Sequence, residues 1–193
     1  NGYHRTNINT VASKAGISIG ALYKYFSSKE ELFLETLRAG MGLIEDVYSR
    51  AMEAGTDPFE RIRAVFLGVL CQSRENPHAL RLYLSLLSPD TDEIASRYAR
   101  TIEEVGCASL KAIVNQGIAS GAIRPGIDVN TAVLFLDNHL MMFAFSQISR
   151  YLRIRQETFL GGGMDPERFM EETMRVCRTM FAPGCDAAPL TEA

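Results

Sequence analysis

The sequence predicts an all-α fold, and three observations lead to that prediction. Apolar residues recur at spacings of three and four, the period of a helix face, as at Phe59, Ile62 and Phe66. Pairs of a capping residue and a proline, such as Asp57-Pro58, are typical of helix starts. The sequence contains no alternating runs bounded by Asn-Gly or Asp-Gly, the usual sign of β-hairpins.

The amino-terminal third is predicted to hold two short helices and one long helix. The first covers residues 6–15, and the second covers residues 18–26 with Ser18 as its cap. Ser28-Lys29-Glu30-Glu31 has the spacing of a capping box, which predicts a long helix from there to about residue 54.

Five further helices complete the prediction. Asn76-Pro77 and Asp165-Pro166 mark two of the starts, and Gly161-Gly162-Gly163 separates the last two helices. The predicted ranges are 58–75, 77–87, 90–120, 128–160 and 165–181. We expect a head at residues 1–37, a body at residues 38–185 and a frayed tail at residues 186–193.

Length and composition restrict the class of protein. The chain has 193 residues, of which 47% are hydrophobic and 22% charged, as in a typical globular protein. Four cysteines occur without C-x-x-C spacing, so we expect no metal and no cofactor. No apolar run reaches the length of a membrane span and no signal peptide opens the sequence, so we expect a cytoplasmic protein without membrane contact.

Charge is distributed unevenly along the chain. Residues 1–29 contain Arg5, Lys14, Lys24 and Lys29 but no acidic residue, although the whole chain has a net charge of -3. The remainder is therefore acidic. A basic head on an acidic body is the pattern of a module that binds a polyanion.

The two short helices and the long one that follows match the layout of a helix-turn-helix. Gly16 permits the positive φ that a tight turn between the short helices needs. Ile17 is expected to fill the core between them. The amino-terminal residues of the second helix would then face base edges in the DNA major groove.

Nine residues form the predicted DNA-contacting set. Tyrosine hydroxyls and Lys24 suit phosphates, whereas Ile19 and Ala21 can contact a thymine methyl group. Thr6 and Lys29 are placed at helix starts, where backbone N–H groups also favour phosphate. The set is Thr6, Ser18, Ile19, Gly20, Ala21, Tyr23, Lys24, Tyr25 and Lys29.

The segment from Thr6 to Phe33 resembles the DNA-binding segment of the tetracycline-repressor (TetR) family. The matching positions are Val11-Ala12, Ala15-Gly16-Ile17-Ser18, Gly20, Leu22-Tyr23, Tyr25-Phe26 and Lys29–Leu32. The resemblance implies a transcriptional regulator, most often a repressor that a small effector releases from a palindromic double-stranded operator. It also implies a helix ahead of Gly2-Tyr3, which the sequence given does not contain.

The carboxy-terminal helices predict self-association. Residues 131–145 are apolar nearly all round, which indicates burial on more than one side. The last predicted helix adds Phe169, Met170 and Met174. We expect a two-fold homodimer through these two helices, with its heads about 34–36 Å apart to read a palindrome. One large monomeric core is the alternative.

The body is also expected to hold a pocket for a small apolar or aromatic effector, because ligand pockets are apolar with a few polar groups. His139 and Asn138 are polar groups inside the apolar stretch, although a histidine there can equally be a satisfied core residue. The predicted lining is Phe66, Leu70, Tyr83, Leu86, Val105, Asn138, His139, Met142 and Phe143.

Other classes of protein remain as alternatives. A helical protein-interaction adaptor without DNA affinity would share the pattern, and the regulator could be an activator. An enzyme is not expected: Glu75 and His78 have the E-x-x-H spacing of di-iron bundles, but Pro77 marks a helix start between them. Nucleotide-binding and hydrolase motifs do not occur in the sequence.

Overall fold

The all-α prediction is confirmed by the computed structural model, which describes Tyr3, residues 6–163 and residues 165–184. The predicted tail at residues 186–193 lies outside this part of the chain. The helices are α1 (Ile8–Lys14), α2 (Ile19–Tyr25), α3 (Lys29–Glu53), α4 (Pro58–Glu75), α5 (Pro77–Leu84), α6 (Asp92–Ala119), α7 (Val129–Ile148), α8 (Arg150–Leu160) and α9 (Pro166–Phe181). Two 3-10 turns, η1 (Ser85–Leu87) and η2 (Pro89–Thr91), connect α5 to α6. None of the helices in the described ranges is long and apolar enough to cross a membrane.

Side-chain caps begin the helices where the sequence places them. The Ser28 hydroxyl accepts a hydrogen bond from the Glu31 N–H at 3.0 Å, and Asp57 accepts from the Phe59 N–H at 2.9 Å. Asp165 accepts from the N–H groups of Glu167 and Arg168. Each cap satisfies donors that the first helical turn leaves free, so the starts of α3, α4 and α9 are fixed by local sequence.

The prediction of one helix over residues 128–160 is wrong, because the chain breaks at Ser149. This residue is extended (φ -107°, ψ 117°) and separates α7 from α8. Arg153 of α8 donates to the carbonyl oxygens of Ser146 and Gln147, at 3.4 and 3.0 Å. These bonds satisfy carbonyl groups that the end of α7 leaves without helical partners, which stabilises the break.

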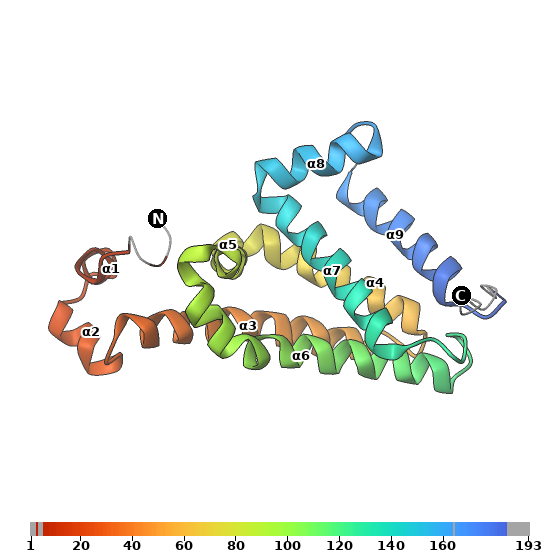
Figure 1. Cartoon of the computed structure of the whole chain (residues 1–193), viewed down its shortest axis with the longest axis horizontal. Coiled ribbons are helices and arrows are strands. Elements are labelled where there is room, and N and C mark those ends of the chain that lie inside the picture. The colour runs from red at the N-terminus through yellow and green to blue at the C-terminus, as the bar shows by residue number, and fades with distance from the viewer. Residues whose placement is uncertain (1–2, 4–5, 164, 185–193) are drawn as a thin grey trace, which may run out of the picture.

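The helices form an elongated body with α1 and α2 at one end (Figure 1). Helix α3 starts at these two helices and continues into the body, where it packs against α4 and α6. Helix α7 contacts α4, α5 and α6, while α9 packs on α4. The core between them contains Phe66, Leu136 and Phe143, each no more than 2% exposed.

A second, smaller apolar cluster joins the head to the body. Its buried members are Phe33 and Leu37 of α3 and Ile94 of α6. Tyr3 packs edge-on against Phe33 with ring centroids 5.0 Å apart. At the same junction, Arg97 of α6 forms an ion pair with Glu30 in the first turn of α3 at 2.7 Å. We call this set of contacts the junction cluster.

Candidate DNA-binding head and effector cavity

Helices α1 and α2 form the predicted helix-turn-helix. They pack through Ala12 and Leu22, both 3% exposed. Gly16 has φ +70°, as predicted for the turn, and the Ile17 N–H donates to the Ala12 carbonyl at 3.1 Å. The prediction that Ile17 fills the core is wrong: its side chain is 43% exposed, whereas Ala12 and Leu22 are the buried residues of the two helices.

The outward face of α2 is open to solvent. Ser18 caps the helix by accepting from the Ala21 N–H at 3.1 Å. Tyr23 and Tyr25 are exposed, as are Gly20, Lys24 and Ile19, while Ala21 is partly buried. The helix therefore presents hydroxyl, ammonium and apolar groups together, which is the mixture that base edges and phosphates require.

The two residues predicted at helix starts differ in their placement. Lys29 is the first residue of α3, and its ammonium group lies 4.7 Å from the centre of the Tyr3 ring. Thr6 lies one residue before the cap of α1, because Asn7 is the residue that accepts from the Asn9 N–H. Thr6 thus flanks the start of α1 and does not cap it.

The corner between α2 and α3 is held by a carboxylate. One oxygen of Glu31 accepts from both the N–H and the hydroxyl of Ser27, each at 2.6 Å. These bonds hold the pKa of Glu31 below its ordinary value, because they stabilise the charged form. The corner joins α2 directly to α3.

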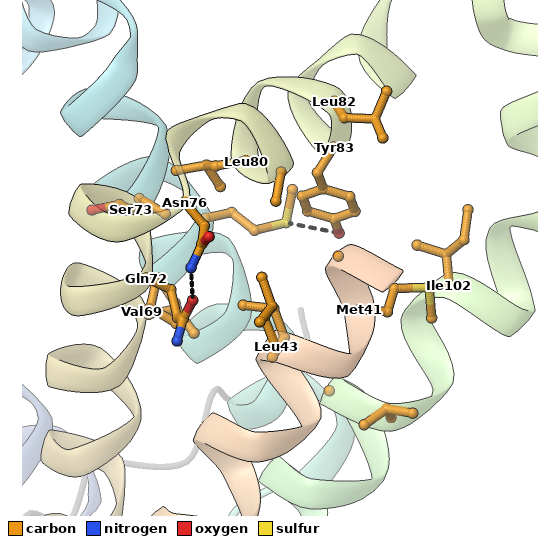
Figure 2. A pocket seen from close by; sticks show the side chains of 18 of the residues that line it. Met41, Leu43, Val69, Gln72, Ser73, Asn76, Leu80, Leu82, Tyr83 and Ile102 are labelled. Carbon is orange, nitrogen blue, oxygen red and sulfur yellow. Dashed lines mark hydrogen bonds between the residues drawn. The ribbon is translucent and has the colours of Figure 1, made fainter. Parts of the chain in front are cut away.

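A cavity of about 130 Å³ lies where α3, α4, α5, α6 and α7 meet. Figure 2 shows Met41 and Leu43 of α3, Tyr83 of α5 and Ile102 of α6 on its walls. At one side, the side-chain Nδ2 of Asn76 donates to the side-chain Oε1 of Gln72 at 2.8 Å. At another, the Tyr83 hydroxyl donates to a carboxylate oxygen of Glu103 at 2.7 Å. The walls are otherwise mostly apolar.

Two acidic residues set the electrostatics of this cavity. Burial, together with the charge of Glu103, raises the pKa of Asp137 to about 6. Burial and the same two carboxylates raise the pKa of Tyr83, and burial with Asp137 raises that of Tyr48. Both hydroxyls consequently remain protonated donors at neutral pH.

The residues predicted to contact the effector lie in different parts of the structure. Tyr83 and Val105 line the cavity. Leu86 packs against the junction cluster, and Phe66, Leu70 and Phe143 are buried in the body core. Asn138 and Met142 are exposed, and the imidazole Nε2 of His139 lies 3.0 Å from the Thr173 hydroxyl of α9.

Helix phase explains this dispersal on α7. The cavity is lined by Asp137, Leu140, Met141 and Ala144, which follow the three-and-four spacing of one face. The predicted residues at positions 138, 139 and 142 lie on other faces of the helix, at least about 100° round from the centre of the lining face. Asp137 was missed, although it is the one charged residue between positions 131 and 145 and so carried a usable signal.

The di-iron spacing has no structural counterpart. Glu75 ends α4 and His78 is in α5, so the two residues do not share a helix. Among the described residues, no group of three or more His, Cys, Asp or Glu side chains is placed to hold a metal ion.

Known proteins provide an independent comparison. Residues 1–36 match the family model "Bacterial regulatory proteins, tetR family". The transcriptional repressor KstR2 of Mycobacterium tuberculosis is 29% identical over 139 residues, which are 70% of this chain and 68% of that protein. KstR2 of Mycolicibacterium smegmatis is 26% identical over 136 residues, 70% of this chain and 66% of its own length. The chain thus spans about two thirds of the length of these curated relatives.

Solved structures agree with the fold. FadR of Bacillus subtilis, solved in complex with stearoyl-CoA, has a TM-score of 0.73 at 20% identity, covering 91% of this chain and 89% of its own. KstR2 of M. tuberculosis has a TM-score of 0.60 at 22% identity, covering 93% and 86%. The matched helix-turn-helix and the shared all-α architecture lead to one conclusion: residues 1–36 form a DNA-binding segment of the TetR type, and the chain as a whole is similar in sequence and fold to bacterial transcriptional regulators of that family.

Proposed function

We propose that the protein is a homodimeric transcriptional repressor that binds a palindromic operator and releases it when a small molecule enters the cavity. The observation that carries the proposal is the path of α3. This helix begins at the corner beside the DNA-reading helix α2, and further along it lines the cavity. One rigid element therefore links the two candidate sites.

The junction cluster supports this linkage. Leu37, Leu82 and Ile102 line the cavity and also pack in the cluster that holds the head. A ligand that displaces these side chains must also alter the support of α3 at its head end. A coupling of about 1–3 kcal/mol is enough for regulation, because both heads must bind the operator in register.

An apolar surface on α7 and α9 favours the homodimer. Leu134 is 61% exposed and Phe135 41% exposed on α7, and Val176 is 52% exposed on α9. Exposed apolar side chains gathered on neighbouring helices are typical of association surfaces. A two-fold dimer would cover the same patch on both copies and would provide two heads for two half-sites.

DNA binding is tested by selecting operator sequences from random duplexes and measuring fluorescence anisotropy at several salt concentrations. We expect Lys24→Ala to weaken operator binding about tenfold and to lower the slope of log affinity against log salt by about 1 in magnitude. Tyr23→Ala should also weaken binding, since the ring belongs to the exposed face of α2. Lys111→Ala, which removes the same charge from the far part of α6, is the matched control.

The alternative of a protein-interaction adaptor makes the opposite prediction. An adaptor would select no duplex sequence and would show no difference between Lys24→Ala and Lys111→Ala. That result would contradict the proposed repressor.

A further inference from the structure

The charged lining of the cavity has a single sign. Among the described residues that line it, Glu103 and Asp137 are the charged ones, and none is Lys, Arg or His. The remaining lining is apolar or neutral and polar. Any ligand in this cavity therefore meets negative charge: Asp137 is partly buried beside apolar walls that reduce screening by water, while Glu103 lies on the exposed side of the lining.

Asp137 lacks a compensating group. Within the described residues it forms neither an ion pair nor a hydrogen bond, although it is partly shielded from water. An unpaired carboxylate in apolar surroundings costs free energy, and a second carboxylate nearby increases that cost. Burial and the charge of Glu103 raise the pKa of Asp137 to about 6, which is the expected result of this unfavourable free energy. A positive group placed beside Asp137 would lower the free-energy cost of its charged form.

Tyr83 positions the carboxylate of Glu103 through a hydrogen bond. Its hydroxyl donates to Glu103 at 2.7 Å, so the hydrogen bond holds Glu103 at the cavity wall. The rings of Tyr48 and Tyr83 also line the cavity, and Figure 2 shows the Tyr83 ring on its wall. Aromatic faces beside carboxylates are the surroundings in which proteins hold ammonium groups.

We propose that the cavity binds a lipophilic cation: a molecule with an apolar body and an amine or quaternary ammonium group that lies beside Glu103 and Asp137. The inference rests on the proposed function, because it specifies the effector of the same site. The apolar walls take the body of the molecule. A carboxylate or phosphate in its place would be repelled by both acidic residues and would find no basic partner in the described lining.

The test uses three probes that share an eight-carbon chain: octyltrimethylammonium, 1-octanol and octanoate. Their binding to the DNA-free protein is measured by isothermal titration calorimetry at pH 7.5. We expect the ammonium probe to bind at least tenfold more tightly than either of the others. Octanoate binding as tightly as the ammonium probe would overturn the inference, as would the absence of binding by all three.

A double variant locates the effect. In Glu103→Gln/Asp137→Asn, the preference for the ammonium probe should fall to about threefold or less, while 1-octanol binding stays the same. Glu104→Gln/Asp46→Asn removes two exposed carboxylates and should keep the full preference. An unchanged preference in the first variant would overturn the inference. The operator affinity of the same preparations is measured without probes, and it tests the proposed repressor function separately from the effector class.

Discussion

The head and the body of this protein are built in contrasting ways. In the head, α1 and α2 are held by two buried side chains, Ala12 and Leu22, and much of their apolar and aromatic surface is exposed. In the body, α3 to α7 and α9 share a continuous core that includes Phe66 and Phe143. Helices α1 and α2 thus present most of their surface, and the described part of the head joins the body through the junction cluster.

The two regions also differ in charge. Lys14, Lys24 and Lys29 make α1, α2 and the start of α3 basic, whereas the cavity of the body is acidic through Glu103 and Asp137. The net charge of -3 conceals this division. These opposite charges agree with the two proposed partners, a polyanion for the head and a cation for the cavity.

The largest expected effect comes from the thin core of the head. Leu22→Ala should cost about 2–5 kcal/mol locally, because it removes one of the two buried side chains between α1 and α2. We expect amide hydrogen exchange to accelerate in α1 and α2 and operator binding to be lost, while the body retains its protection. Ile17→Ala, at a position 43% exposed, is the control and should change little. Equal loss of protection throughout the chain would contradict the separation of head and body.

The next effect concerns the proposed dimer. Leu134→Arg/Val176→Arg places charges on the exposed apolar surface of α7 and α9 and should produce monomers in light scattering. Operator affinity should fall about 10²-fold or more, since two linked heads bind far more tightly than one. Leu87→Arg, at a position 65% exposed in η1, should remain dimeric. Retention of the dimer in the α7/α9 variant would reject this surface as the interface.

The same contrast explains what the sequence could predict. In the head, short-range chemistry determines the structure: Ser18 and Ser28 cap their helices, and Gly16 makes the turn with a positive φ. Such features need only neighbouring residues, so the helix-turn-helix and the exposed face of α2 followed from the sequence. Ile17 is the exception: it was predicted to be buried but is exposed, because whether it is covered depends on tertiary packing.

In the body, the face that each helix turns to the cavity depends on tertiary packing. Helix α7 is apolar nearly all round, so its sequence contains little information about which face turns to the cavity, and the predicted residues lie on other faces than the lining. The break at Ser149 was missed for a similar reason. It depends on Arg153 reaching back to the carbonyl groups of α7, and apolar periodicity does not reveal that contact.

A smaller effect should come from Asp137. Its pKa is raised to about 6 in the folded protein, from an ordinary value of 3.8, so the folded state binds more protons between these values. This residue therefore lowers stability progressively as pH rises from about 4 to 6, and the penalty persists above that range. Asp137→Asn should stabilise the protein at pH 7.5 by on the order of 1 kcal/mol and by much less at pH 4.

Urea denaturation at the two pH values measures this difference. Asp46→Asn, which removes an exposed carboxylate from α3, is the control and should show no comparable dependence on pH. Stabilisation by Asp137→Asn that is equal at pH 4 and pH 7.5 would contradict the electrostatic origin of the effect, because both Glu103 and burial act only on the charged form.

The smallest effect is expected at the boundary between head and body. Arg97 pairs with Glu30 across α6 and α3, but half of the Arg97 side chain is exposed, so water and salt screen the pair. Arg97→Gln should lower the free energy of unfolding only slightly at low salt and by less at 0.5 M salt. Arg100→Gln, at an exposed position one turn further along α6, is the control. A double-mutant cycle with Glu30→Gln isolates the pair, and a coupling that persists at 0.5 M salt would show that the junction is held by more than its apolar cluster.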